Sequence, residues 1–171
     1  MGIGTRIDPG GPEADFGILV HAWLEGLTEG WDEAELAGRL DLDAATRARV
    51  TAMARRILEA PSLTPAFDTR LHLAARNEME FLDPTGRVNR MDRLVEFADQ
   101  VWVLDYKTGG LDEPDLARRA LPHLEQMAAY RAAAAALHPG KPVRVALAFG
   151  DGCVHWLEDG APLGDDSANL A

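Results

Sequence analysis

The sequence has 171 residues, of which 47% are hydrophobic, and its 28 acidic and 17 basic side chains give a net charge of −11. This size and composition predict one folded domain, and the acidic charge argues against nonspecific binding to nucleic acid. A single cysteine, Cys153, excludes an internal disulfide, a multi-cysteine zinc site and a four-cysteine iron–sulfur cluster. No membrane span or signal peptide is recognisable, so we expect a cytoplasmic protein.

The N-terminal third of the chain is predicted to be helical. We interpret residues 1–12, rich in glycine and proline, as a flexible leader, and residues 13–159 as the folded domain. A helix is predicted over residues 12–27 because apolar residues recur there at helical spacing, namely Phe16, Leu19, Val20, Trp23, Leu24 and Leu27. A short and a longer helix are predicted within residues 31–61, the second ended by Pro61.

Strands are predicted from Thr69 to Lys107, where polar and apolar residues alternate with period two. A turn at residues 83–86 and another near residues 98–99 divide this stretch into a three-stranded antiparallel meander. A helix restarted at Pro122 is predicted over residues 113–140, followed by a strand pair within residues 141–158 and a polar tail over residues 160–171. This order predicts an α/β fold, with a mixed central sheet flanked by helices.

Two acids and a lysine stand out in the meander. Asp92 lies in the second predicted strand, while Asp105 and Lys107 end the third, after the apolar run 101–104. Period two places the side chains of Asp105 and Lys107 on one face of the sheet and that of Tyr106 on the other. Two carboxylates and the backbone carbonyl of Tyr106 form the oxygen-rich site that Mg²⁺ prefers, and a lysine beside that ion stabilises a phosphodiester under attack.

Asp92 in "MDRL" and Asp105 in "DYKTG", separated by twelve residues, resemble the PD-(D/E)xK nuclease signature, specifically that of RecB-like nuclease domains. His21 resembles the family's helical histidine, which implies that it binds the metal. Glu78 resembles the acid on the first core strand of the family. Gln126 and Tyr130 in "EQMAAY" resemble its Q-x-x-x-Y helix, which implies substrate binding. The family often has glycine three residues before the first core acid, where this chain has Asn89.

The resemblance implies a restriction-endonuclease-like core that hydrolyses DNA with Mg²⁺ or Mn²⁺. Asp92, Asp105, Lys107 and Glu78 would then be catalytic, and His21, Asp92, Asp105 and the Tyr106 carbonyl would hold the metal. The chain looks most like the C-terminal nuclease domain of AddA-type helicase–nucleases, which implies single-stranded DNA, an attached helicase and an AddB-like subunit in double-strand break repair and recombination. The 171 residues contain no G-x-x-x-x-G-K-[ST] phosphate loop, the motif expected of a helicase.

Several residues keep an alternative interpretation. His21 and Tyr130 also fit as helix residues packed against the core, and Glu80 competes with Glu78 because a regular strand puts both on one face. Arg93 is interpreted as a solvated strand residue in preference to a phosphate contact.

Two alternative functions are open at this point. The first is a nuclease-derived DNA-binding or assembly module with weak catalysis, which retention of both core acids and Lys107 disfavours. The second is an unrelated acidic α/β domain that binds a protein partner, which explains the net charge of −11 best and the order of the motifs worst.

Overall fold

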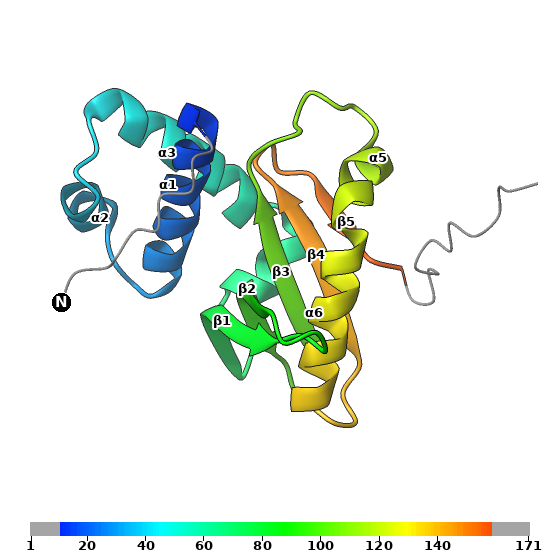
Figure 1. Ribbon diagram of the computed structural model, residues 1–171. Helices are drawn as coiled ribbons and strands as arrows, with labels where there is room; N and C mark the ends of the chain where they lie inside the picture. The colour runs from blue at the N-terminus through cyan, green and yellow to red at the C-terminus, as the bar shows by residue number, and fades with distance from the viewer. Residues whose placement is uncertain (1–10, 159–171) are drawn as a thin grey trace, which may run out of the picture.

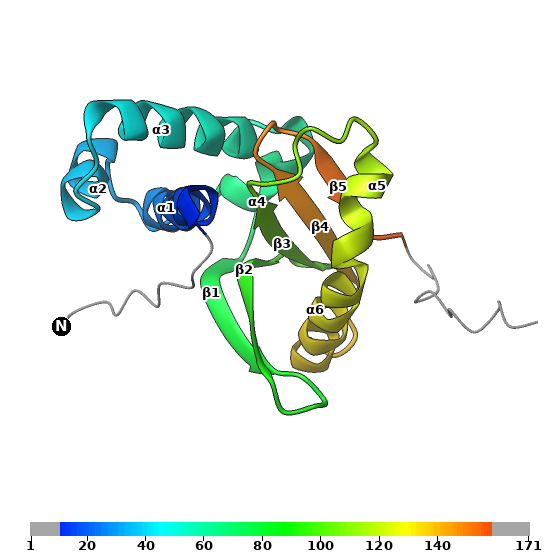
Figure 2. The same cartoon turned by 45° about the horizontal axis from the view of Figure 1, so that its top comes forward.

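The computed structural model describes residues 11–158, and the predicted tail and most of the predicted leader lie outside this range. Figures 1 and 2 show a central sheet with a helical layer on each side. Helix α1 spans Gly11–Thr28, so the last two residues of the predicted leader, Gly11 and Pro12, are helical instead. Within the described residues, no helix is both long and apolar enough to cross a membrane.

The first helical layer contains the three predicted helices and one short helical segment that the sequence pattern did not predict. Helices α2, Glu33–Arg39, and α3, Ala44–Leu58, begin at Asp32 and Asp43, whose side chains accept backbone N–H groups of the first turn. Beyond Ala60, where Pro61 starts a new segment, a 3₁₀ turn, Pro61–Leu63, leads into α4, Thr64–Phe67. These short elements bring Ala66 and Phe67 against the sheet, where they matter for the site.

The five strands form one sheet in the order β1-β2-β3-β4-β5. Their bounds are Ala74–Leu82, Val88–Glu96, Val101–Lys107, Val143–Phe149 and Val154–Trp156. β1, β2 and β3 are the predicted antiparallel meander, β3 and β4 are parallel, and β4 and β5 are antiparallel. The structure therefore confirms the mixed sheet flanked by helices, a restriction-endonuclease-like arrangement.

The parallel pair β3–β4 requires a crossover, and the second helical layer provides it. Helix α5, Leu116–Ala120, a 3₁₀ turn, Leu121–His123, and helix α6, Leu124–Leu137, follow one another across the sheet. The restart predicted at Pro122 falls in that 3₁₀ turn. Figure 2 shows α6 running along β3 and β4, with α1 and α3 on the opposite side of the sheet.

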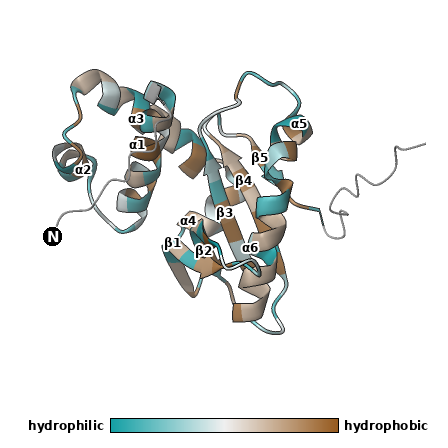
Figure 3. Ribbon diagram, in the orientation of Figure 1, coloured by the Kyte–Doolittle hydropathy of each residue, from teal (hydrophilic) through white to brown (hydrophobic). Residues whose placement is uncertain are grey.

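Each face of the sheet has its own hydrophobic core. Residues such as Trp23, Leu104 and Tyr106 form the core under α1 to α4, whereas Val103 and Tyr130 belong to the core under α6. β3 is buried along its length until Lys107, because it has a strand on each side and helices on both faces. In Figure 3 the hydrophobic colouring of β3 gives way to hydrophilic at its C-terminal end, where the candidate site lies.

Candidate active site

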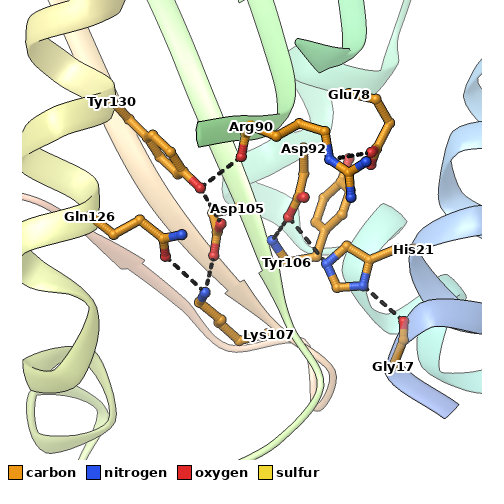
Figure 4. Close-up of polar contacts among 10 residues, drawn as sticks. All are labelled: Gly17, His21, Glu78, Arg90, Asp92, Asp105, Tyr106, Lys107, Gln126 and Tyr130. Atoms are coloured by element: carbon orange, nitrogen blue, oxygen red, sulfur yellow. Dashed lines mark hydrogen bonds and ion pairs between the residues drawn. The ribbon is translucent and has the colours of Figure 1, made fainter. Parts of the chain in front are cut away.

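The candidate site lies where β2 separates from β3. The ladder between them runs from Glu96↔Val101 to Arg93↔Leu104, and one further step would set Asp92 opposite Asp105. Instead, the Asp92 carboxylate accepts the backbone N–H of Tyr106 at 2.6 Å and takes the place of a backbone acceptor. The two acids therefore lie at this split between β2 and β3, and Figure 4 shows Asp92 next to His21 and Asp105 next to Lys107.

Helix α1 contributes His21 to this split. Its Nδ1 lies 2.8 Å from the Gly17 carbonyl oxygen and its Nε2 lies 3.2 Å from Asp92 Oδ2. Both ring nitrogens face acceptors, which favours the doubly protonated imidazolium. Burial lowers the pKa of His21, but the hydrogen bond to Asp92, the charge of Asp92 and the Gly17 carbonyl outweigh it and raise the pKa to about 9.

Gly17 also lets α1 come close to the loop that follows β3. A Cβ atom at this position would lie 2.8 Å from Thr108 Oγ1, a contact tighter than real side chains allow. Because glycine destabilises a helix interior by about 1 kcal/mol relative to alanine, its position one turn before His21 is a signal of close packing. That signal was available in the sequence, and the interpretation of the motif missed it.

Asp105 and Lys107 form the second half of the site, on the α6 face. Lys107 Nζ lies 2.7 Å from Asp105 Oδ2, and Asp105 is only 3% exposed. Burial, followed by the charge of Asp92, raises the pKa of Asp105, while Lys107 opposes the rise. As period two predicts, Tyr106 faces the other way, with its ring centroid 5.8 Å from that of His21.

Helix α6 supports this pair through the two residues of the Q-x-x-x-Y motif. Gln126 Oε1 accepts a hydrogen bond from Lys107 Nζ at 3.0 Å, and the Tyr130 hydroxyl lies 3.2 Å from Asp105 Oδ1. Tyr130 is 1% exposed, and its hydroxyl also lies 2.8 Å from the carbonyl oxygen of Arg90. The structure thus places both residues as supports of Asp105 and Lys107, and their role in substrate binding stays a prediction.

Glu78 stands beside this site because its backbone departs from a regular strand. Its φ is 52°, and the β1–β2 register passes from Asn77↔Arg93 to Met79↔Met91 without it. Left-handed backbone at a residue other than glycine costs about 1 kcal/mol. The Glu78 carboxylate lies 2.6 Å from Arg90 Nε, and burial raises its pKa, with Arg90 opposing.

The structure distinguishes Glu78 from its competitor Glu80. Glu80 keeps its place in the ladder opposite Arg90 and is exposed, whereas Glu78 is close enough to Asp92 and His21 for their charges to affect its pKa. Of the two acids, Glu78 is therefore the one near Asp92 and His21, and its role as the accessory acid stays a prediction.

The interpretation of Arg93 as a solvated strand residue is wrong. Arg93 is 3% exposed, and its guanidinium donates two hydrogen bonds to the Ala66 carbonyl, at 3.1 and 3.0 Å, and one to Asn77 Oδ1 at 2.8 Å. It also lies over the ring of Phe67, 5.4 Å from the centroid. An alternating strand pattern cannot reveal this burial, because it depends on the unpredicted segment containing Ala66 and Phe67.

Two charged residues of the site escaped the sequence interpretation altogether. Arg90 pairs with Glu78. Glu25 follows His21 by one helical turn, and its pKa is raised by burial and by the charge of Glu29. Arg90 is near enough to Glu25 to oppose this rise. Arg90 precedes Asp92 by two residues, so period two alone put both on one face. That spacing was a usable signal for Arg90.

The family of the chain follows from comparison with known proteins. The profile of the PD-(D/E)XK nuclease superfamily matches residues 2–154, so the chain belongs to that superfamily. Membership defines a nuclease-type domain and implies DNA as the substrate. Among curated proteins, none matched this sequence significantly.

Nucleases of this superfamily generally use divalent metal ions, and the residues of the site have suitable donor chemistry. Asp92 and Asp105 offer oxygen ligands, and the Gly17 carbonyl accepts from Nδ1 of His21, the orientation usual for a histidine that binds metal through Nε2. Within residues 11–158, no three His, Cys, Asp or Glu side chains are already gathered around a common point. The donors fit a divalent ion, but each acid is paired with a base of the protein.

The pair of His21 and Asp92 makes the stability of the metal-free protein depend on pH. Because folding raises the pKa of His21 from 6.5 to about 9, its contribution is fully present below pH 6.5 and is lost as the pH rises through 9. We expect the free energy of unfolding in EDTA to fall by on the order of 2 kcal/mol between pH 6.5 and 9. Urea denaturation across this range measures it.

His21→Gln is the matched control for this pH dependence. The variant keeps a side chain that can hydrogen-bond to Asp92 but cannot titrate, so its stability should stay nearly level over the same range. Parallel curves for the variant and the wild type would show that His21 is not the titrating group.

Proposed function

We propose that this chain hydrolyses phosphodiester bonds of DNA with Mg²⁺ or Mn²⁺. The observation that supports this most is the meeting of Asp92, Asp105 and Lys107 at the split between β2 and β3 in a chain of a nuclease superfamily. Membership in that superfamily gives the class of reaction. The hydrogen bonds and ion pairs around the three residues support a separate role for each of them.

Asp92 and Asp105, together with Nε2 of His21 and the Tyr106 carbonyl, would hold the cation. A divalent ion bound there supplies Lewis-acid stabilisation of the phosphoryl oxygens and makes water a stronger nucleophile. The Lys107 ammonium stabilises the negative charge that develops on the phosphodiester, and Gln126 fixes its position through the hydrogen bond to Nζ. Glu78 assists as the accessory acid next to Asp92.

We further propose that the chain acts as a RecB-like nuclease unit of the AddA type in the cytoplasm. In this proposal an attached helicase and an AddB-like subunit deliver single-stranded DNA during double-strand break repair and recombination. Support comes from the joint order of His21, Asp92, "DYKTG" and "EQMAAY", and from the charge. A chain with a net charge of −11 repels DNA, so a basic partner would supply most of the affinity.

Divalent ions should both stabilise the protein and activate it. Millimolar Mn²⁺ or Mg²⁺ should raise the Tm of the wild type, because the cation binds the folded state and relieves repulsion between Asp92 and Asp105. The same ions should permit cleavage of a labelled single-stranded oligonucleotide, and EDTA should stop it. Differential scanning calorimetry and a gel assay measure the two effects.

Asp92→Ala should lose both the Tm shift and the cleavage, because it removes a central ligand. If Mn²⁺ left the Tm of the wild type unchanged, the proposed metal site would be contradicted. Cation-dependent DNA binding without cleavage, even with a helicase partner supplied, would favour the alternative of a catalytically weak binding module.

A further inference from the structure

Three of the acids of the site are each paired with a different base. Asp92 contacts His21, Asp105 contacts Lys107, and Glu78 contacts Arg90, at 3.2, 2.7 and 2.6 Å. The side chains of the three bases are 29%, 20% and 57% exposed, in the same order. Arg90 is therefore the base that a DNA strand can reach most readily.

The backbone of Arg90 is fixed to the site although its head group is exposed. Its carbonyl oxygen lies 2.8 Å from the Tyr130 hydroxyl, which also contacts Asp105. From this anchored position the Arg90 side chain extends to the Glu78 carboxylate, near His21 and Asp92 in Figure 4. A strand whose scissile phosphate lies at Asp92 and Asp105 would pass near this exposed guanidinium, because its partner Glu78 is close enough to Asp92 for the charge of Asp92 to affect the pKa of Glu78.

The ion pair between Arg90 and Glu78 is well suited to exchange. A pair whose arginine is so exposed contributes little to stability, so little is lost when the pair opens. A guanidinium binds a phosphate through the same two parallel hydrogen bonds that it can make with a carboxylate, so a phosphate can replace Glu78 as the partner of Arg90. Glu78, held in left-handed backbone beside Asp92, would be left as a free carboxylate next to a second acid.

We propose that Arg90 binds a phosphate of the DNA strand, and that Glu78 retains the Arg90 guanidinium while the site is free of cation. With a divalent cation present, Glu78 would help Asp92 to hold the ion and would release Arg90. This inference rests on the proposed function and adds a substrate-contacting residue to it. It also gives the DNA strand a cationic contact at a site that contains the acids Glu25, Glu78, Asp92 and Asp105.

The test measures binding of a fluorescent single-stranded oligonucleotide to the full chain in Ca²⁺ and in EDTA, with a gel to confirm that the probe stays intact. In Ca²⁺, Arg90→Gln should weaken binding about tenfold, because it removes one charge-assisted phosphate contact. The slope of log affinity against log salt should fall by about 0.7. In EDTA the same substitution should change the affinity less than about twofold, since Glu78 still holds Arg90.

Glu78→Gln provides the second arm, because it frees Arg90 without a cation. This variant should bind DNA more tightly than the wild type in EDTA, and Glu78→Gln combined with Arg90→Gln should lose the gain. Arg70→Gln is the matched control: Arg70 is 86% exposed and lies 2.7 Å from Asp68, which like Glu78 is 21% exposed. Arg70 is close in sequence to Leu73, whose N–H donates to the carbonyl of Glu96 at the end of β2 farther from Arg90. Arg70 is therefore away from the site, and Arg70→Gln should leave DNA binding unchanged.

The outcomes separate the two proposals. If the wild type cleaves DNA with Mg²⁺ but Arg90→Gln binds in Ca²⁺ as tightly as the wild type, the exchange is overturned and the proposed function stands. A gain for Glu78→Gln that persists in the double variant would also overturn it, because removal of any acid would then suffice. If the wild type showed no cleavage and no cation-dependent binding of DNA, both proposals would be overturned.

Discussion

Lys107→Ala should lower kcat for DNA cleavage by about 10²- to 10³-fold, the usual cost of losing one electrostatic contact with a transition state. The structure supports this size of effect because the ammonium is only 20% exposed and is fixed by both Asp105 and Gln126. A charge that is fixed before the reaction needs no reorganisation while negative charge develops on the phosphodiester. Single-turnover cleavage of single-stranded DNA in Mg²⁺ or Mn²⁺ measures the loss.

DNA affinity and metal binding should change little in Lys107→Ala, which distinguishes a role in the transition state from a role in binding. Metal-free Lys107→Ala should be less stable than the wild type, because Asp105 stays buried without its ion-pair partner. Added Mg²⁺ should restore part of this stability, so the assay is run on protein already saturated with the ion. Metal binding by calorimetry on the same sample shows whether the site is intact.

Lys107→Arg is the sharper control for the same position. It keeps the positive charge but replaces the compact ammonium that contacts both Asp105 and Gln126 with a broad planar group of different geometry. We expect Lys107→Arg to be impaired as well. Equal cleavage by the wild type and Lys107→Ala would instead identify Lys107 as an ordinary charge at the end of a strand.

The strands and their faces could be predicted because period two determines them locally. The alternation from Thr69 to Lys107 located β1, β2 and β3, and it put Asp105 and Lys107 on one face with Tyr106 on the other. Proline and glycine marked the turn at residues 83–86 for a similar reason, since their effect on the backbone is local. The four-residue spacing of Gln126 and Tyr130 likewise predicted a common helix face, which contacts Asp105 and Lys107.

The rest of the site depends on contacts that no local pattern contains. The left-handed backbone of Glu78 and its pairing with Arg90 arise only when β1 lies against β2. The separation of β2 from β3 is similarly invisible in the sequence, because Asp92 ends the ladder by accepting the N–H of Tyr106 from another strand. The sequence motifs identified most of the acids and bases of the site, but tertiary packing determines which base is paired with which acid.

Arg93 shows most clearly how tertiary structure changes the meaning of a strand residue. Its partners in the structure are the Ala66 carbonyl, the Asn77 amide and the ring of Phe67, all of them neutral groups. Asn77 in turn donates to the Thr28 hydroxyl at the end of α1. Arg93, the residue after Asp92, thus connects α4 and β1 directly, and through Asn77 it also connects to α1, the helix that carries His21.

Arg93→Ala should lower the free energy of unfolding by about 3 kcal/mol or more, because it leaves a cavity and removes the donors that satisfy Ala66 and Asn77. Arg93→Met should lose less, since it restores much of the apolar volume but none of the hydrogen bonds. Urea denaturation in EDTA measures both, and Arg144→Ala is the control. Arg144 is an exposed strand arginine over the Trp156 ring at 4.1 Å, so its loss should cost no more than about 1 kcal/mol. If Arg93→Ala were as mild as Arg144→Ala, the guanidinium would be solvated in solution, and the link from Asp92 to the helix of His21 would have to run through other contacts.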